Sequence, residues 1–393
     1  MISYICCKLI YCNLMTQKDI YIDNTFSQSL LSWFDECGRK HLPWQQNKTP
    51  YRIWVSEIML QQTQVTTVIP YYQKFMERFP EVTDLAVASE EEVLYFWSGL
   101  GYYSRARNLH KASKKIVNEF FGAFPRSVER LMELPGIGRS TAGAIASISM
   151  GIRAPIMDGN VKRVITRNFA IHGWPGEARV ANELWEIAEK LTPESRTGDY
   201  TQVMMDLGAT VCKRSKPICQ VCPLETSCIA HQTGREKQFP EVKPKKNKPE
   251  RSTVMLMAVN QHSEILLEKR PPSGIWGGLW GFPEISDPEE VVEQARTKTG
   301  LVLNEYDMWQ SFRHTFSHYH LNVTPVLAFV EYPGQCVKEV KGNYCWFLLN
   351  KLPELGLATP VRKLIQKISA VPLIFKSITF DVSSEERDRL DFP

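Results

Sequence analysis

Long hydrophobic runs and a strong net charge are both missing from this sequence of 393 residues. No apolar stretch approaches the roughly 18 residues that a membrane-spanning helix needs, so we expect no membrane partner. The 47 basic and 43 acidic residues leave a formal charge of only +4, which is too small to indicate nucleic-acid binding by itself. Internal repeats and low-complexity tracts are also absent, which leaves the class of ordinary globular proteins.

The start of the chain lacks the features of a secretion signal. Its first 14 residues are apolar, but Lys8 interrupts them, no basic region leads them and no small-residue cleavage site follows. Met15 is an alternative start, so we expect residues 1–21 to be a disordered N-terminal extension. Without a secretory context the ten cysteines suggest a reducing compartment, where clustered cysteines are more often metal ligands or catalysts than disulfides. We therefore expect a cytoplasmic protein.

Length and periodicity predict two domains. The chain is too long for one ordinary core, and 43% hydrophobic residues are enough to fill two. Residues 22–236 repeat apolar positions every three or four residues, which predicts an all-helical domain, and residues 253–372 place a helical stretch between strands, which predicts a mixed α and β domain. Residues 237–252 combine prolines with basic side chains and predict a linker, whose charges either solvate a tether or contact a phosphate backbone. Residues 373–393 form a tail without a predicted function.

Four cysteines lie among basic residues in the stretch CKRSKPICQVCPLETSC. They are Cys212, Cys219, Cys222 and Cys228. A structural zinc site usually takes two close pairs, whereas here one close pair is flanked by two single cysteines. Four thiolates from one short loop better suit an iron–sulfur cluster, and their spacing resembles the 4Fe–4S loop of the endonuclease III and MutY glycosylases. We predict a 4Fe–4S cluster at residues 212–228 that shapes a DNA-binding loop, with zinc and unligated thiols as the alternatives.

A second motif, LPGIGRSTAGAI, predicts a tight turn between two helices. Gly136 and Gly138 permit the turn and let backbone N–H groups approach an anion such as a DNA phosphate. Alone, this pattern also fits a packed corner without function. Asp158 follows in the stretch MDGNVKRV, however, and the hairpin with the downstream aspartate resembles the core of the helix-hairpin-helix DNA glycosylases.

Two carboxylates are candidates for breaking the bond between base and sugar. Its transition state resembles an oxocarbenium ion, which a carboxylate near the sugar stabilises, and Asp158 suits that role. Asp158 also fits a helix N-cap ahead of Gly159, which would fix its orientation. A departing adenine needs a proton, and Glu57 lies on a predicted helix near Trp54 and Ile58, which would desolvate its carboxyl and raise the pKa. The alternative for Glu57 is an exposed helical glutamate.

Six stretches together resemble the MutY family of adenine DNA glycosylases from about residue 26 to 365: LPWQ, SEIMLQQTQV, GLGYYSRARNLHKA, LPGIGRSTAGAI, MDGNVKRV and MMDLGA. The resemblance implies that Glu57 is the catalytic acid and Asp158 the second catalytic carboxylate. It also implies that Gln62 and Tyr102 wedge into the duplex, whereas without it Tyr102 reads as a core aromatic and Gln62 as a solvated helix end. The implied substrate-binding residues of this region are Arg39, Trp44, Leu60, Gln62, Thr63, Leu100, Tyr102 and Gln202.

The C-terminal domain resembles a Nudix fold through GGLWGFPE ahead of a helix. Nudix hydrolases bind Mg²⁺ through paired glutamates on that helix, but here the matching positions fall within Arg296, Thr297 and Lys298, so the metal site has been lost. The stretch FRHTFSHYHL remains, and part of it matches the MutY loop that inspects 8-oxoguanine; plain alternation along a strand is the alternative. The matching residues are Phe316, Ser317 and His318.

Together these features predict a mainly α protein, with a two-lobed helix-hairpin-helix domain, a 4Fe–4S loop and a C-terminal α+β Nudix-like domain. The resemblance implies a monomeric, monofunctional adenine glycosylase acting on duplex DNA with adenine opposite 8-oxoguanine or guanine. Endonuclease III-like enzymes, which also cut the strand, carry a nucleophilic lysine where this hairpin has Ser140, so we expect no strand cleavage. We expect Ser140 and Lys162 at the DNA backbone with the two hairpin glycines. The alternatives are an endonuclease III-like glycosylase and lyase for oxidised pyrimidines, and a non-catalytic iron–sulfur protein that marks mispairs.

Overall fold

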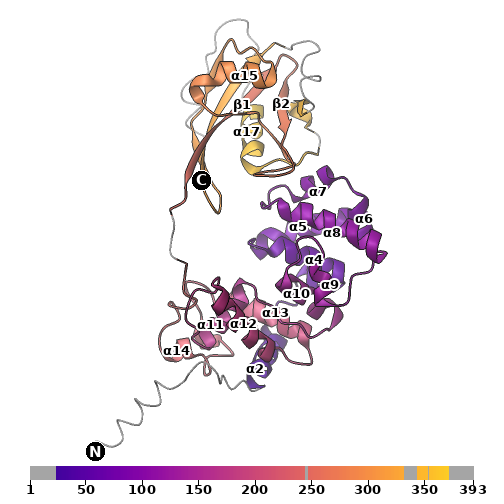
Figure 1. The fold of residues 1–393 in the computed structure, drawn as a ribbon, viewed down its shortest axis with the longest axis vertical. Coiled ribbons are helices and arrows are strands. Elements are labelled where there is room, and N and C mark those ends of the chain that lie inside the picture. The colour runs from indigo at the N-terminus through magenta and orange to yellow at the C-terminus, as the bar shows by residue number, and fades with distance from the viewer. Residues whose placement is uncertain (1–23, 244–246, 332–342, 353, 371–393) are drawn as a thin grey trace, which may run out of the picture. The chain divides into compact units, whose positions relative to one another are not determined.

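The computed structural model describes residues 24–243, 247–331, 343–352 and 354–370. The predicted extension at residues 1–21 and the predicted tail at residues 373–393 lie outside these ranges. The chain divides into two compact units, each built from two separate segments (Figure 1). The first unit comprises Met1–Ile58 and Ala123–Pro244, and the second comprises Met59–Gly122 and Lys245–Pro393.

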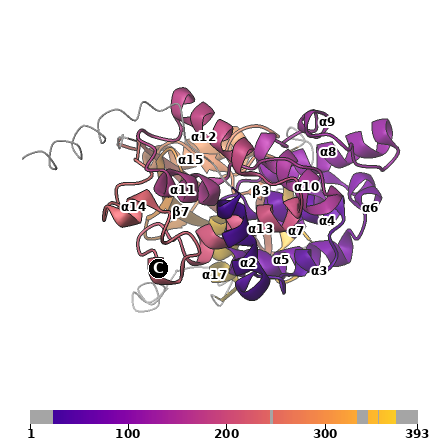
Figure 2. The ribbon, with the colours of Figure 1, turned by 90° about the horizontal axis from the view of Figure 1, so that it is seen from below.

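The first unit is helical throughout its described elements. In chain order they are α2 (Thr25–Cys37), α3 (Pro43–Gln46), α4 (Pro50–Leu60, whose last residues enter the second unit), α9 (Val128–Met132), α10 (Arg139–Met150), α11 (Gly159–Asn168), α12 (Ala178–Leu191), α13 (Thr197–Thr210), the 3₁₀ turn η1 (Cys219–Val221) and α14 (Ile229–Gln232). Helix α13 is central, because it packs against α2, α10 and α11, and both ribbon views show it beside α10 (Figures 1 and 2). Its apolar residues Val203, Met204 and Leu207 are buried, and the polar Gln202 and Asp206 on the same helix are buried with them.

Helix α4 starts where the local chemistry favours a helix start. Proline is tolerated in the first turn because its missing N–H would have no partner there, and α4 begins at Pro50. The hydroxyl of Thr49 accepts a hydrogen bond from the Arg52 N–H at 3.2 Å, which satisfies one of the free donors of that turn. This start sets the rotation of the helix that carries Glu57.

In its described residues the second unit combines helices with a mixed sheet. Its helices and strands are α5 (Val65–Arg78), α6 (Val82–Val87), α7 (Glu90–Trp97), α8 (Ser104–Phe120), β1 (Glu250–Asn260), β2 (Glu264–Lys269), β3 (Trp280–Gly281), β4 (Glu284–Ile285), η2 (Pro288–Glu290), α15 (Val291–Thr299), β5 (Tyr306–Met308), β6 (Phe312–Thr315), β7 (His320–Val330), β8 (Tyr344–Leu348), η3 (Leu349–Lys351) and α17 (Thr359–Ala370). The strand order is β3-β2-β1-β7-β5, with β4 paired to β1, β6 to β7 and β8 to β2. Strands β1 and β7 run parallel, in register from Glu250 opposite His320 to Asn260 opposite Val330.

Helices α15 and α17 flank the strands of this sheet (Figure 1). Val254, Leu256 and Ala258 alternate along β1 and are buried against Val291 and Ala295 of α15, as the two-residue period of a strand requires. Helical residues are thus followed by a mixed sheet along the chain, and the predicted fold class is confirmed.

Buried hydrogen bonds join the helical and sheet-containing parts of the second unit. The Ser98 hydroxyl donates to the carbonyl of Leu357 at 2.6 Å and accepts from the Arg362 guanidinium at 2.6 Å. The Arg107 guanidinium donates to the carbonyl of Gly277 at 2.5 Å. These contacts explain why residues 59–122, which the sequence places with the first helices, belong to the same compact unit as the sheet.

Candidate active site

Glu57 is partly buried on α4, close enough to Asp158 for the two charges to interact. Burial raises the pKa of Glu57 to about 8, and the negative charge of Asp158 contributes to the same shift. Among the described residues, no hydrogen bond to the Glu57 carboxyl lowers its pKa against these two effects. Glu57 therefore carries a proton at neutral pH, as a general acid must.

Asp158 caps the N-terminus of α11, which is the orientation that the sequence allowed for. Its Oδ1 accepts hydrogen bonds from the backbone N–H groups of Asn160 at 3.0 Å and Val161 at 2.8 Å. Its Oδ2 accepts a third from the Asn160 amide at 3.1 Å. Burial raises the pKa of Asp158, while these hydrogen bonds favour its ionised form. The two neighbouring carboxyls thus differ in their surroundings, because three hydrogen bonds favour the charge of Asp158 and none is found for Glu57 among the described residues.

The helical hairpin holds the segment in front of Asp158. Gly136 lies between α9 and α10 with φ at 81°, which explains a glycine there, and Gly138 is the N-cap of α10. Both glycines are exposed, as contact with a DNA phosphate would require. The Ser140 hydroxyl accepts a hydrogen bond from the Met157 N–H at 2.9 Å. Ser140 thus fixes the residue that precedes Asp158.

The residues expected around adenine meet on a buried carboxylate of α13. The Arg39 guanidinium contacts Asp206 at 2.8 and 2.9 Å, and the Arg39 N–H donates to the same carboxylate. The Gln202 amide donates to Asp206 at 2.7 Å, and its oxygen accepts from the Gln45 amide at 2.5 Å. Trp44 is buried on the adjoining helix α3. The structure thus brings Arg39 and Gln202 together, while Leu60 lies on α4 in the other unit.

Asp206 is the member of this group that the sequence did not reveal. Its side chain is fully buried, and it orients Arg39 and Gln202 together. The motif MMDLGA contains Asp206. An aspartate within an apolar helical motif, however, does not indicate which side chains it will contact in the folded protein. A buried ion pair with satisfied oxygens is expected to position its partners more than to stabilise the fold.

The four cysteines of residues 212–228 lie near one another in the first unit. Burial raises the pKa of Cys219 to about 11 and that of Cys222 to about 12, and repulsion from the other thiolates adds to both shifts. The pKa of Cys228 is raised for the same reasons, and repulsion from Cys212 contributes. Thiols held this close can all ionise only with a cation between them, which is what a metal or an iron–sulfur cluster supplies. The residues present therefore fit a four-thiolate group.

A buried arginine organises this cysteine loop. The Arg167 guanidinium donates to Cys212 Sγ at 3.3 Å and to the Lys213 and Arg214 carbonyls at 2.8 and 3.0 Å. It also donates to the carbonyls of Glu236 and Phe239. Only 2% of Arg167 is exposed. One side chain from α11 thus ties the start of the loop to the segment that follows it, and no motif in the sequence identified it.

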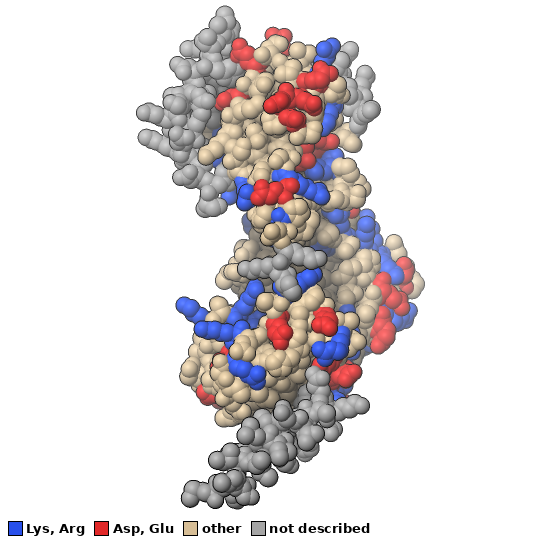
Figure 3. Space-filling model, turned by 60° about the vertical axis from the view of Figure 1, so that its left-hand side comes forward, with Lys and Arg blue, Asp and Glu red and all other residues tan. Residues whose placement is uncertain are grey.

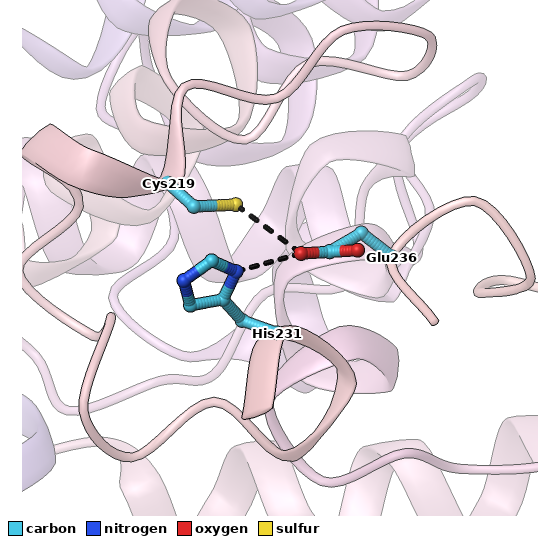
Figure 4. A group of neighbouring side chains, drawn as sticks. All are labelled: Cys219, His231 and Glu236. Carbon is cyan, nitrogen blue, oxygen red and sulfur yellow. Dashed lines mark hydrogen bonds and ion pairs between the residues drawn. The ribbon is translucent and has the colours of Figure 1, made fainter. Parts of the chain in front are cut away.

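Cys219 also belongs to a mixed group of possible metal ligands with His231 and Glu236 (Figure 4). Their ligand atoms lie within 4.8 Å of one another, and His231 Nδ1 lies 2.6 Å from Glu236 Oε1. One sulfur, one nitrogen and one oxygen suit zinc, the alternative inferred from the sequence. Only one of the four cysteines takes part, however, whereas the thiolate repulsion described above involves all four.

A second arginine connects the cysteine loop to Asp158. The Arg163 guanidinium donates to the Cys212 carbonyl at 2.6 Å and to the Asn160 side-chain oxygen at 2.9 Å. The Asn160 amide in turn donates to Asp158. The cysteine loop is thus connected to Asp158 through Arg163 and Asn160. A group that orders the loop is therefore expected to order the hydrogen bonds of Asp158 as well.

In the second unit, Gln62 and Tyr102 both adopt left-handed backbone conformations. Their φ angles are 57° and 48°, which a residue with a side chain adopts only under constraint from its surroundings. Tyr102 is 46% exposed, so the alternative of a core aromatic does not describe it, and Gln62 is exposed as well. Leu100 is buried beside them in the chain.

The constraint comes from Arg105 of α8, which the sequence did not single out. Its guanidinium donates to the carbonyls of Gln61 at 2.7 Å and Leu100 at 3.2 Å, and to the Thr63 hydroxyl at 3.3 Å. It also lies over the Tyr102 ring at 5.5 Å from the centroid. Burial lowers the pKa of Arg105 to about 10. This single cation holds both expected wedge loops in the same unit.

Tyr102 and the loop between β6 and β7 line one cavity of about 410 Å³ in the second unit. Phe316, Ser317 and His318 contribute to its wall, together with Trp276. Phe316 is held against Trp276, with ring centroids 5.3 Å apart, while Ser317 and His318 are exposed. Tyr102, which is expected to enter the duplex, and the residues expected to inspect 8-oxoguanine thus line one cavity.

On one face of the molecule, basic side chains do not form a uniform patch. On the face drawn in Figure 3, Lys and Arg are mixed with Asp and Glu, as the small net charge suggests. Lys213, Arg214 and Lys216 of the cysteine loop are exposed, and Lys162 is partly exposed on α11. Contact with DNA phosphates would therefore come from separate points.

Comparison with known proteins agrees with this geometry. Residues 55–190 match the HhH-GPD superfamily of base excision DNA repair proteins, and residues 254–367 match the NUDIX domain. An adenine DNA glycosylase of Buchnera aphidicola is 40% identical over 87% of this chain and 97% of its own length. The chain belongs to the adenine DNA glycosylase family. The human adenine DNA glycosylase is 37% identical over 89% of this chain and 75% of its own length. Among solved structures, an endonuclease III–DNA complex covers 58% of this chain and 97% of its own, at 22% identity and a TM-score of 0.45.

The resemblance to adenine DNA glycosylases and the assignment to base-excision DNA glycosylases are thereby confirmed. The Nudix-like domain is confirmed with them, and Arg296, Thr297 and Lys298 lie on α15. Within the described residues, no helix is both long enough and apolar enough to cross a bilayer.

Proposed function

We propose that this chain hydrolyses the N-glycosidic bond of adenine opposite 8-oxoguanine or guanine in duplex DNA. The observation that carries the proposal is the pairing of two neighbouring carboxyls in different environments. The pKa of Glu57 is about 8, and three hydrogen bonds favour the carboxylate of Asp158. One group can donate a proton to the base while the other stabilises positive charge on the sugar.

In the proposed reaction the adenine leaves the base stack and enters the region of Arg39 and Gln202, next to Glu57. Unstacking costs a few kcal/mol, which contacts from Tyr102 and Gln62 in the emptied space would offset. Glu57 protonates the adenine ring as the glycosidic bond lengthens, and Asp158 stabilises the developing oxocarbenium ion. Water then attacks the sugar carbon, and the product is an abasic site.

The proposed reaction stops at the abasic site because the hairpin has no lysine amine at position 140. Strand cleavage of the endonuclease III type needs a lysine that forms a Schiff base with the sugar. The corresponding position holds Ser140, whose hydroxyl binds the Met157 N–H. Lys162 on α11 is assigned to a phosphate contact and not to this chemistry.

We further propose that Cys212, Cys219, Cys222 and Cys228 bind a 4Fe–4S cluster. The grouping of all four thiols supports this group over zinc at Cys219, His231 and Glu236. When bound, the cluster would supply the cationic centre that these thiolates need and would stiffen the loop carrying Lys213, Arg214 and Lys216.

The second unit is proposed to read the base opposite adenine. Guanine and 8-oxoguanine differ only at the C8 oxygen and the N7 hydrogen, so a few polar groups against that edge can separate them. Ser317 and His318 are exposed polar residues on the rim of the cavity that Tyr102 also lines. This supports a division of work in which the first unit holds the chemistry.

One assay tests the proposed function against both alternatives. Purified protein is incubated with duplexes containing 8-oxoguanine:A, G:A or thymine glycol, with and without alkali. The proposal expects excision from the first two duplexes, with strand breaks only after alkali. Cleavage of the thymine glycol duplex without alkali would favour an endonuclease III-like lyase, and binding without excision would favour a protein that only marks mispairs.

A further inference from the structure

The loop that carries Ser317 and His318 is a tight reversal between β6 and β7. The Phe316 N–H donates to the Tyr319 carbonyl at 2.9 Å, which closes the turn. Phe316 and Tyr319 form the base of the loop, since Phe316 packs on Trp276 and Tyr319 is 4% exposed. Ser317 and His318 remain exposed at the tip.

The end of the basic stretch between the two domains forms one side of this loop. The Pro249 carbonyl accepts a hydrogen bond from the His320 N–H at 2.9 Å, and β1 then pairs with β7 from Glu250 onward. The Arg251 guanidinium lies over the Tyr319 ring at 4.8 Å from its centroid. At this end, the predicted linker therefore packs against the strands of the second unit and is more than a solvated tether.

Lys248 makes the contact that reaches the loop tip. Its Nζ donates a hydrogen bond to the carbonyl of Phe316 at 2.9 Å. A charged donor makes this bond stronger than an ordinary one between neutral groups. Because a trans peptide holds its C=O and N–H in opposite directions, a Phe316 carbonyl turned toward Lys248 turns the Ser317 N–H away from it. Among the described residues no acceptor takes up the Ser317 N–H.

We infer that Lys248 is a positioning residue for recognition of the base opposite adenine. It fixes the Phe316–Ser317 peptide so that the N–H and the side chains of the tip are presented together to the edge of that base. An N–H donor suits the C8 oxygen of 8-oxoguanine, an acceptor that guanine lacks. This inference rests on the proposed function, because it requires that the second unit reads the opposite base.

The test uses Lys248→Met, which keeps the length of the side chain but removes the charge and the donor. The full chain also carries Glu57→Gln, so that dissociation constants can be measured without excision. Duplexes with 8-oxoguanine:A and with G:A are compared across a range of salt concentrations. We expect Lys248→Met to reduce the preference for 8-oxoguanine:A over G:A by about tenfold, the scale of one charge-assisted hydrogen bond.

Two matched variants separate positioning from general charge. Lys243→Met removes a charge from the same basic stretch, but Lys243 lies over the Trp174 ring in the first unit, so its preference ratio should equal that of the parent. Lys248→Arg keeps a charged donor and should retain most of the preference. The dependence of binding on salt should keep the same slope in Lys248→Met, because no phosphate contact is lost.

A different pattern would overturn the inference. If Lys248→Met weakened both duplexes equally and lowered the salt slope by about one phosphate contact, Lys248 would bind the DNA backbone instead. An unchanged preference ratio would show that the loop tip needs no support from Lys248. If the parent protein showed no preference for 8-oxoguanine, the proposed function itself would fail, which is a separate outcome.

Discussion

The carboxylate of Asp158 helps to hold the pKa of Glu57 at about 8, second only to burial. The pair lies in one compact unit, on α4 and at the N-terminus of α11, and each carboxyl has a different environment. Among the described residues, no hydrogen bond contributes to the pKa shift of Glu57. The carboxylate of Asp158, in contrast, accepts three hydrogen bonds. Their different roles in the proposed reaction follow from this difference.

The pH dependence of excision should report the proton of Glu57. Because the acid must be protonated and its pKa is about 8, kcat/KM should fall about tenfold per pH unit above that value. Single-turnover excision from an 8-oxoguanine:A duplex, measured between about pH 6 and pH 10, would show the decline. A rate that stays constant well beyond pH 8 would mean that Glu57 does not supply the proton.

Glu57 should also reduce stability at neutral and alkaline pH. Folding raises the pKa of Glu57 from 4.5 to about 8, so the folded protein favours the protonated carboxyl. The stability of the fold therefore falls progressively as the pH rises from about 4.5 to about 8. One pKa unit is worth about 1.4 kcal/mol, so Glu57→Gln should stabilise the protein by a few kcal/mol near pH 8. At about pH 4.5 the two proteins should melt at similar temperatures. An equal difference in Tm at both pH values would contradict the assigned pKa.

Metal analysis should find iron bound to the cysteine loop. Four thiolates that hold a cubane imply about four irons per chain and a brown protein. Cys222→Ala should lose most of the iron, whereas Cys37→Ala, which changes an exposed cysteine elsewhere in the first unit, should lose none. Because Arg163 joins Cys212 to Asn160, loss of the cluster should slow excision as well as weaken DNA binding. Stoichiometric zinc with no iron would instead support the site at Cys219, His231 and Glu236.

Arg105 should be required for both wedge loops. Arg105→Lys keeps the charge but cannot reach the carbonyls of Gln61 and Leu100 together, and unpaired buried carbonyls cost about 1–3 kcal/mol each. We expect a lower Tm and a larger loss of excision from duplex DNA than of binding, because the base would leave the stack less readily. The exposed Arg126→Lys serves as the control and should change neither. Excision at the parent rate in Arg105→Lys would show that the loops hold their conformation unaided.

The sequence indicated candidate reactive groups more readily than the side chains that hold them. Glu57, Asp158 and the cysteines could be proposed because the features that mark them are local: an apolar helix, a cap position and a short loop. Arg105, Arg163, Arg167 and Asp206 could not, since their partners are backbone carbonyls or side chains distant in sequence. The grouping of residues 59–122 with the sheet also depends on contacts such as Ser98 with Leu357. A motif suggests which groups could react, but long-range hydrogen bonds decide how they are held.

Glu57→Gln, measured on one 8-oxoguanine:A duplex for both binding and single-turnover excision, tests the central claim most directly. The amide keeps the shape of the side chain but has no proton to give to the base. We predict a dissociation constant within about threefold of the parent and excision slower by roughly 10²–10⁴, the range that general acid catalysis contributes. Excision within about tenfold of the parent, with the same affinity, would contradict the assignment of Glu57 as the acid and with it the proposed mechanism.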